Sequence, residues 1–179
     1  MLLAGGQTRH SWATTALKLA SAGYNALAVD LKGHGNSYWD PDGDYSPPSL
    51  ANDIVALAHS MALRDRPVVV VGASLGGLAL LAAAASIENL EAAVLVDITP
   101  KMERNGVNRI LGYMRETMKS GFATIEEAAD SIQQYTSNRK RSRNLESVRK
   151  NLRVGDDGRF YWHWDPAFVD SVRGIPRGE

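Results

Sequence analysis

VVVVGASLGG, at residues 68 to 77, is the stretch of sequence that determines the fold class of this chain. Its four consecutive valines show no polar alternation, so they predict a strand that is apolar on both faces. Such strands are typical of central positions in a parallel sheet that helices cover. An apolar helix is predicted from Leu75 to Ser86, and Ala93 to Ile98 predicts another strand of the same kind.

Between the first strand and this helix, residues 72 to 76 fit the pattern G-x-S-x-G, with Ser74 at its centre. A serine hydroxyl is a poor nucleophile unless an exposed, strained turn holds it beside a base, and the flanking glycines allow such a bend. At a helix N-terminus, the Leu75 amide and the helix dipole can stabilise a developing oxyanion. The pattern therefore predicts Ser74 as a catalytic nucleophile, and the alternative is a glycine-rich turn that only packs tightly.

The residues before this motif alternate between extended and helical segments, which is typical of βαβ units and a parallel sheet. Proline in the first turn, with serine before it, predicts the start of a helix near Ser46. The expected order is a strand end, a turn, a helix, a strand and a second helix, at Met1–Ala4, Gly5–Gln7, Trp12–Ala22, Asn25–Asp30 and Ser46–Leu63.

After Pro100 the pattern changes to helical segments alone, with no further strand-like run until Phe160 to Trp164. Thr124 and Glu127 form a capping-box pattern that predicts a helix to about Tyr135. We therefore expect an α/β core over residues 1–100 and a helical lid or cap over residues 101–179.

The composition excludes several classes of function. The 179 residues carry no net charge and no cysteine, which disfavours nucleic-acid binding and removes disulfides and thiolate ligands. No metal-binding motif occurs, and the longest apolar region is too short to cross a membrane. The expectations are a cytoplasmic protein without cofactor or metal, and without nucleic-acid or membrane partners.

The motifs together resemble the α/β-hydrolase family, and particularly its peroxidase-like branch, the cofactor-free haloperoxidase-related hydrolases. The strings that carry the resemblance are LLAGGQTRHSW, DLKGHGNS, VVVVGASLGG and VLVDITP, and NLESVRKNLRVGDDGRFYWHWDP is similar to the lid of that branch. The resemblance implies a mostly parallel sheet with flanking helices and a helical lid. It also implies hydrolysis of carboxylic esters or related acyl compounds by Ser74, with an oxyanion hole formed by the amides of Leu75 and of Gly5 or Gly6.

The sequence departs from this family in two places. Leu3-Ala4 stands where members have His-Gly before the oxyanion glycines. The strands that precede this turn in the family, and the C-terminal strands that carry its catalytic acid and histidine, have no counterpart here. The chain is therefore expected to be truncated at both ends.

The resemblance leaves the acid and the base open. Asp97 is the candidate acid and His163 the candidate base, because the family order is serine, acid, histidine and only His163 follows Ser74 among the histidines. The alternatives are a structural aspartate in a turn and a histidine that packs in the lid. A further alternative is an inactive fragment that acts as a binding or interaction module, and an exposed sheet edge would allow homo-oligomers.

Overall fold

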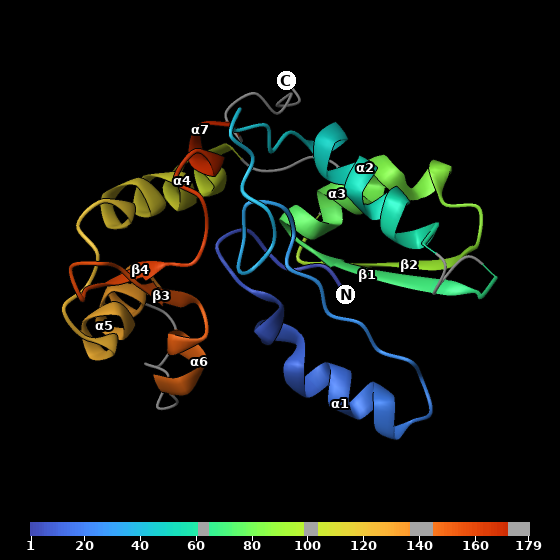
Figure 1. The fold of residues 1–179 in the computed structure, drawn as a ribbon, viewed down its shortest axis with the longest axis horizontal. Helices are drawn as coiled ribbons and strands as arrows, with labels where there is room; N and C mark the ends of the chain where they lie inside the picture. Colours follow the sequence, from blue (N-terminus) through green and yellow to red (C-terminus); the bar gives the residue numbers. More distant parts are fainter. Residues whose placement is uncertain (61–64, 99–103, 137–144, 172–179) are drawn as a thin grey trace.

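The computed structural model describes residues 1–60, 65–98, 104–136 and 145–171, and Figure 1 shows how they are arranged. The elements follow one another as η1 (Arg9–Trp12), α1 (Ala13–Ser21), α2 (Pro47–Ala58), β1 (Val68–Ala73), α3 (Leu75–Ala83), η2 (Ala84–Ser86), β2 (Leu90–Val96), α4 (Arg104–Met118), α5 (Ile125–Tyr135), α6 (Leu145–Arg149), β3 (Leu152–Val154), β4 (Phe160–Trp162) and α7 (Phe168–Ser171).

The predicted parallel pairing is present at the centre of the first half. β1 and β2 run parallel, with Val70 opposite Ala93 and Ala73 opposite Val96. Leu2 makes parallel bridges both to Gly72 in β1 and to Val29. The two predicted N-terminal strands are thus single bridges, and they continue the parallel pairing beyond β1. The predicted α/β class, with a parallel sheet and packed helices, is therefore confirmed.

The second predicted strand is apolar, as expected, but the expectation that both of its faces are buried is wrong. Val94, Leu95 and Val96 are 43%, 38% and 38% exposed. Within the described residues β2 pairs with β1 on one side, and α3 packs on one face of the pair. The apolar pattern of β2 therefore meets solvent at its other edge and face. The homo-oligomer expected through this edge stays a prediction.

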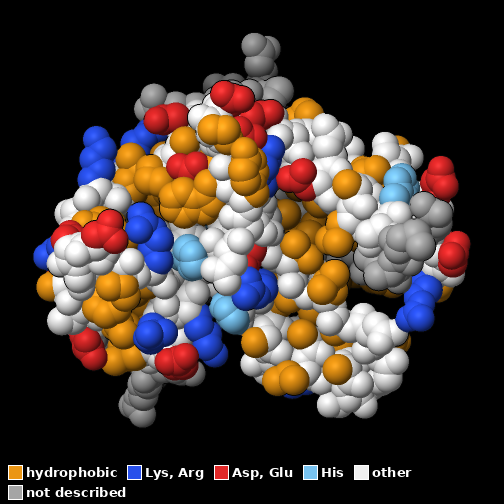
Figure 2. Space-filling model, viewed as in Figure 1, with side chains coloured by type: hydrophobic (Ala, Val, Ile, Leu, Met, Phe, Trp, Pro, Cys, Tyr) orange, Lys and Arg blue, Asp and Glu red, His pale blue; other side chains and the backbone are white. Residues whose placement is uncertain are grey.

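Helices α2 and α3 pack against each other, and α3 packs on the sheet (Figure 1). Pro47 occupies the first turn of α2, as predicted, but the Ser46 side chain makes no capping hydrogen bond. The helix ends at Ala58 rather than Leu63, and residues 61–64 lie outside the described part. Helix α1 buries none of its residues and lies apart from the sheet. Exposed hydrophobic side chains accordingly lie over α1 and beside the sheet in Figure 2.

The strand-like run predicted at Phe160 to Trp164 is confirmed as β4, but β4 pairs antiparallel with β3, which lies in the stretch expected to be helical alone. The predicted start of the lid near Lys101 lies outside the described residues. The capping box of α5 is present in a shifted form. Thr124 Oγ1 accepts from the Glu127 amide at 3.1 Å, whereas Glu127 Oε2 accepts from the Ala123 amide rather than from that of Thr124.

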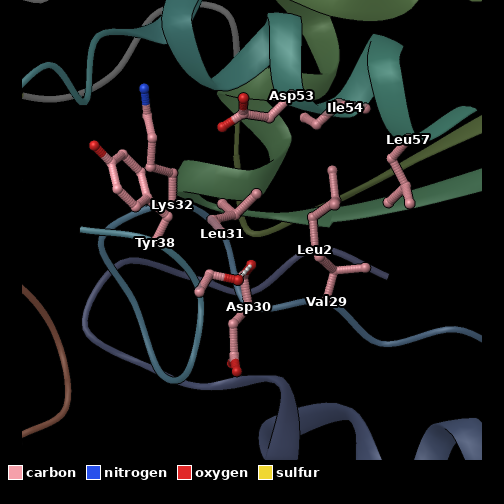
Figure 3. Close-up of a pocket in the computed structure, with 10 residues that line it drawn as sticks. Leu2, Val29, Asp30, Leu31, Lys32, Tyr38, Asp53, Ile54 and Leu57 are labelled. Carbon is pink, nitrogen blue, oxygen red and sulfur yellow. Dashed lines mark hydrogen bonds between the residues drawn. The ribbon is translucent and has the colours of Figure 1, made fainter. Parts of the chain in front are cut away.

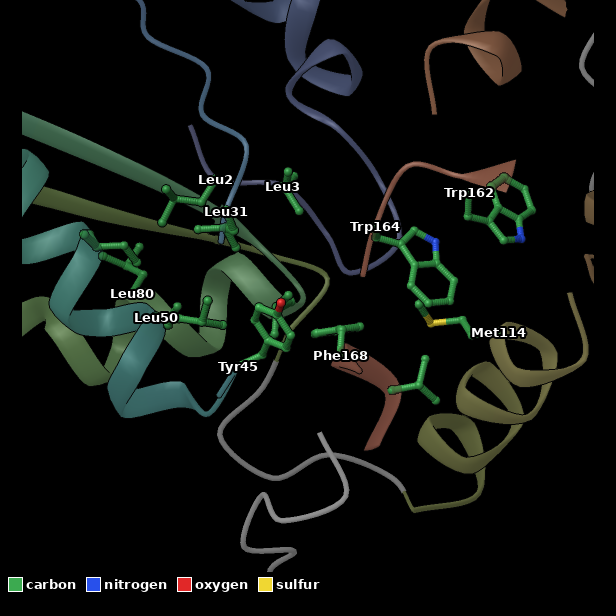
Figure 4. Close-up of a cluster of buried hydrophobic side chains, with 14 of the residues drawn as sticks. Leu2, Leu3, Leu31, Tyr45, Leu50, Leu80, Met114, Trp162, Trp164 and Phe168 are labelled. Atoms are coloured by element: carbon green, nitrogen blue, oxygen red, sulfur yellow. The ribbon is translucent and has the colours of Figure 1, made fainter. Parts of the chain in front are cut away.

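One buried cluster runs from the sheet half into the lid half. On the sheet side it contains Leu3, Leu50 and Leu80, and on the lid side Met114 and two tryptophans. Figure 4 shows Phe168 between these two groups of side chains. The two predicted units therefore share one hydrophobic core, and α7 joins them.

Candidate active site

Ser74 lies at a sharp turn between β1 and α3, as the motif predicts. Its φ of 44° and ψ of −109° place a non-glycine residue in the left-handed half of backbone space, which costs about 1–3 kcal/mol unless the surroundings enforce it. The Ser74 amide donates to Val96 O at 3.0 Å, and Ser74 O accepts from Leu78 N at 3.0 Å. The turn is thereby fixed to β2 on one side and to α3 on the other.

The glycines on either side of Ser74 have no room for a side chain. A Cβ at Gly72 would lie 2.4 Å from Gly76 O, and one at Gly76 would lie 2.8 Å from Leu3 O. Both obstacles are backbone atoms, which cannot rotate away. The spacing G-x-S-x-G is thus a packing requirement between β1, α3 and the N-terminal segment.

The N-terminal segment places the second predicted turn beside Ser74. Leu2 N donates to Val71 O at 2.7 Å, and Gly76 N donates to Leu3 O at 3.1 Å. A Cβ built on Gly5 would lie 3.7 Å from Leu75 Cβ. The structure therefore brings Gly5 next to Ser74 and Leu75, although Gly5 lies about seventy positions earlier in the sequence.

The two candidate glycines differ in their hydrogen bonds. Gly6, whose φ is 81°, donates its amide to His34 Nε2 at 3.1 Å. Among the described residues, the Gly5 amide makes no hydrogen bond. Leu75 is the first residue of α3, where a helix leaves its amides without an intrahelical partner. Within the described part of the chain, the amides of Gly5 and Leu75 thus have no hydrogen-bond partner, whereas the Gly6 amide has one.

His34 is completely buried, and it was not predicted to hold the oxyanion turn. Its Nδ1 lies 3.3 Å from Lys32 O, so the ring fits the neutral tautomer that donates from Nδ1 and accepts at Nε2. Burial lowers the pKa of His34 from its ordinary value of 6.5 to about 4, although Asp30 and Asp165 oppose the shift. The ring is thus neutral at neutral pH and keeps its acceptor.

This depressed pKa predicts that acid destabilises the fold. The unfolded chain takes up a proton on His34 below about pH 6.5, whereas the folded chain resists until about pH 4. The contribution of neutral His34 to the free energy of unfolding is therefore fully present above pH 6.5. It falls by about 2 to 3 kcal/mol as the pH drops to about 4.5. Urea unfolding at pH 7 and 4.5 measures this. In His34→Phe the pH-dependent loss should shrink by that amount, and an unchanged loss would contradict the assignment.

An ion pair between a partly exposed arginine and a buried carboxylate holds the same turn from its other end. Asp30 is 5% exposed, and it accepts from the Arg9 amide and forms an ion pair with the Arg9 guanidinium. Asp30 Oδ2 also accepts from Asn36 N at 3.2 Å. The loop of residues 30–37 is therefore tied to residues 6–9 by both His34 and Asp30. In the sequence, the only sign of this pair was Asp30 at the end of a strand-like segment.

The structure does not bring the candidate acid and base together. Asp97 directly follows β2, adopts a φ of 52° and is exposed. His163 is half-buried; burial lowers its pKa, and its charged neighbours include Asp30 and Arg153. Within the described residues, no hydrogen bond or ion pair joins His163 to Ser74 or Asp97. A complete triad of these three residues is thus not assembled here.

A cavity of about 300 Å³ lies beside this region but does not include Ser74 among its lining residues. Figure 3 shows Asp53, Ile54 and Leu57 on the α2 side, facing Leu2 and Val29 on the sheet side. Its walls are mainly apolar. It lies at the outer edge of the sheet half rather than at the strand-to-helix turn.

The described residues offer neither a metal site nor a membrane span. They contain no group of three or more histidine, cysteine, aspartate or glutamate side chains that could hold a metal ion. No helix in the same part of the chain is long and apolar enough to cross a membrane.

Residues 1–175 match the family model of the alpha/beta hydrolase family. Esterase Rv0045c of Mycobacterium tuberculosis is 33% identical over 175 residues, which cover 90% of this chain and 54% of the esterase. Protein phosphatase methylesterase 1 of Schizosaccharomyces pombe is 27% identical, with 95% of this chain and 53% of the relative covered. The chain spans about half the length of these curated relatives.

Solved structures agree with this. A structure of esterase Rv0045c superimposes with a TM-score of 0.76 at 30% identity, covering 99% of this chain and 59% of the esterase. An alpha/beta hydrolase from Novosphingobium aromaticivorans gives a TM-score of 0.76 at 27% identity, covering 93% of this chain and 59% of the other.

Proposed function

Because the chain belongs to the alpha/beta hydrolase family, we propose that it carries the nucleophile and oxyanion hole of a serine hydrolase that acts on carboxylic esters. The observation that supports this most directly is the strained backbone of Ser74, with a φ of 44°, at the N-terminus of α3. Strain of this kind persists where the surroundings enforce it, and it is typical of functional sites. The names of the two curated relatives, an esterase and a methylesterase, support an ester as substrate.

In this proposal, Ser74 Oγ attacks the ester carbonyl carbon, and the carbonyl oxygen becomes an oxyanion. The amides of Leu75 and Gly5 donate to that oxygen, and the dipole of α3 adds to the stabilisation. Collapse of the tetrahedral intermediate expels the alcohol and leaves an acyl group on Ser74. Water then releases the acid. A base must accept the proton of Ser74 during the attack and the proton of water during release of the acid. Within the described residues, neither His163 nor another histidine makes a hydrogen bond to Ser74.

The second candidate is an inactive fragment that acts as a binding or interaction module. The observation that favours it is the separation of Ser74, Asp97 and His163, which form no hydrogen-bonded triad within the described residues. The two candidates make different demands on Ser74. Only the first requires that its hydroxyl be more reactive than that of an ordinary serine.

Labelling with a fluorophosphonate tests the proposal. We expect slow labelling that mass spectrometry maps to Ser74, because the Leu75 and Gly5 amides stabilise the phosphoryl oxygen even without a base. Ser74→Ala should abolish it. The control is Ser86→Ala, at the end of η2, which should leave the labelling unchanged. Labelling spread over several serines, or absent at Ser74, would favour the interaction module.

A further inference from the structure

The turn that carries Gly5 and Gly6 has a partner that the proposed chemistry does not use. Ala4 O accepts from Gln7 N at 3.1 Å, which closes the turn. The Gly6 amide, in its middle, points at His34 Nε2 at 3.1 Å rather than at an open space. His34 lies twenty-eight positions later, in the loop of residues 30–37. A long-range side chain therefore decides which amide of the turn is occupied.

The position of the His34 ring is itself fixed on several sides. His34 N donates to Leu31 O at 2.9 Å, and Nδ1 lies 3.3 Å from Lys32 O. The Phe168 ring meets the His34 ring edge to face, with centroids 4.8 Å apart. Nothing of the ring is exposed. The ring therefore cannot turn away from Gly6 without losing a hydrogen bond inside the core.

The surroundings of the turn leave little freedom for other arrangements. Phe168 Cζ would lie 3.3 Å from a Cβ on Gly5, and Met114 Cε would lie 3.5 Å from a Cβ on Gly6. The Arg9 amide is held by the buried Asp30 carboxylate just after the turn. Rotation of the Gly5–Gly6 peptide would break the hydrogen bond from the Gly6 amide to His34.

From this geometry we infer that His34 is a positioning residue. By accepting the Gly6 N–H at Nε2, it locks the turn so that the Gly5 amide, and not that of Gly6, acts with Leu75 on the oxyanion. The inference rests on the proposed function for its consequence in catalysis. The lock itself is independent of catalysis, because it is a hydrogen bond between two described residues. The neutral state of the ring, derived above from its burial, agrees with an acceptor at Nε2.

Two substitutions separate the hydrogen bond from the shape of the ring. His34→Phe keeps a planar ring against Phe168 but removes the acceptor. His34→Gln keeps an acceptor oxygen near the position of Nε2. Each is measured in the 179-residue chain by hydrogen exchange of the Gly6 amide and by the rate of fluorophosphonate labelling of Ser74. His59→Gln is the control, because His59 is exposed at the end of α2.

We expect His34→Phe to remove the protection of the Gly6 amide and to slow Ser74 labelling by at least about tenfold, since loss of one oxyanion donor costs roughly 10² to 10³. His34→Gln should restore most of both, and His59→Gln should change neither. A merely structural role would lower stability in both His34 variants without this rescue. If His34→Phe does not fold, the NMR chemical shifts of the two ring nitrogens of His34 in the wild-type protein test the inference. A ring protonated at Nε2 cannot accept from the Gly6 amide and would contradict it.

The outcomes distinguish the inference from the function on which it rests. Labelling at the wild-type rate in His34→Phe, with Gly6 exchanging freely, would overturn the positioning role and leave the proposed function standing. Wild-type protein that is not labelled at Ser74 would overturn the proposed function. In that case protection of the Gly6 amide would still show whether the lock exists.

Discussion

The 179-residue chain is expected to hydrolyse a chromogenic short-chain ester only slowly, roughly 10³ to 10⁴ times faster than water alone. This is the residual rate that serine hydrolases retain, through the oxyanion hole and substrate binding, once the triad is disabled. The physical reason is that no histidine accepts the Ser74 proton within the described residues. A complete triad would add roughly 10⁶ in rate, the order of the factor of about 2 × 10⁶ that is lost when one is removed.

Substitutions at the candidate triad distinguish these cases. Ser74→Ala and His163→Ala should each change the residual rate by less than about tenfold, because members of a triad act as a unit and an unassembled unit has little to lose. The rate is measured in initial-rate assays beside an enzyme-free blank. Robust turnover that both substitutions abolish would contradict the prediction, and it would establish Ser74 and His163 as catalytic partners, with Asp97 as the candidate acid.

Gly72→Ala should destabilise the protein by about 3 kcal/mol and abolish the labelling of Ser74. The added methyl group would lie 2.4 Å from Gly76 O, 2.7 Å from Gly76 C and 2.8 Å from Gly77 Cα, so β1 and α3 must move apart. Overpacking of this kind costs about 1 to 3 kcal/mol even where side chains can adjust, and here only backbone can yield. Urea unfolding at pH 7 measures the difference in the free energy of unfolding between this variant and the wild type.

The matched control is Gly112→Ala in α4, where no atom lies within 4 Å of the new Cβ. Alanine is favoured over glycine inside a helix by about 1 kcal/mol, so this variant should be equally or more stable. Similar losses in both variants would show that the clash at Gly72 is relieved by small movements. The close approach of β1 and α3 would then not be what fixes the Ser74 turn.

The strand-to-helix turn around Ser74 could be predicted from the sequence because its causes are local. Four valines favour a strand, an apolar run favours a helix, and two glycines allow the bend between them. The structure confirms each of these, including the unusual backbone of Ser74. The capping of α5 by Thr124 was predictable for the same reason, since its partner is three residues away.

The predictions of strand burial and of the lid's secondary structure failed where the outcome depends on neighbouring elements rather than on the local sequence pattern. The sequence of β2 has the composition of a buried strand, but burial depends on a neighbour on its free edge and a helix on its free face. The hairpin of β3 and β4 was read as helix and a late strand because three-residue strands are too short to show a period. The haloperoxidase-related branch stays a prediction.

The α/β class and the order of strand, Ser74 and helix could be predicted from the sequence alone, because they follow from steric limits on neighbouring residues. The pair Gly5 and Gly6 was implied by the family resemblance. The choice between Gly5 and Gly6 is different. It depends on a hydrogen bond from Gly6 to His34, a ring held in place by Lys32 O and Phe168. Such a contact exists only once the loop of residues 30–37 and α7 pack against the N-terminal turn. Tertiary structure alone decided it, because a buried amide must find an acceptor and folding determines which one lies within reach.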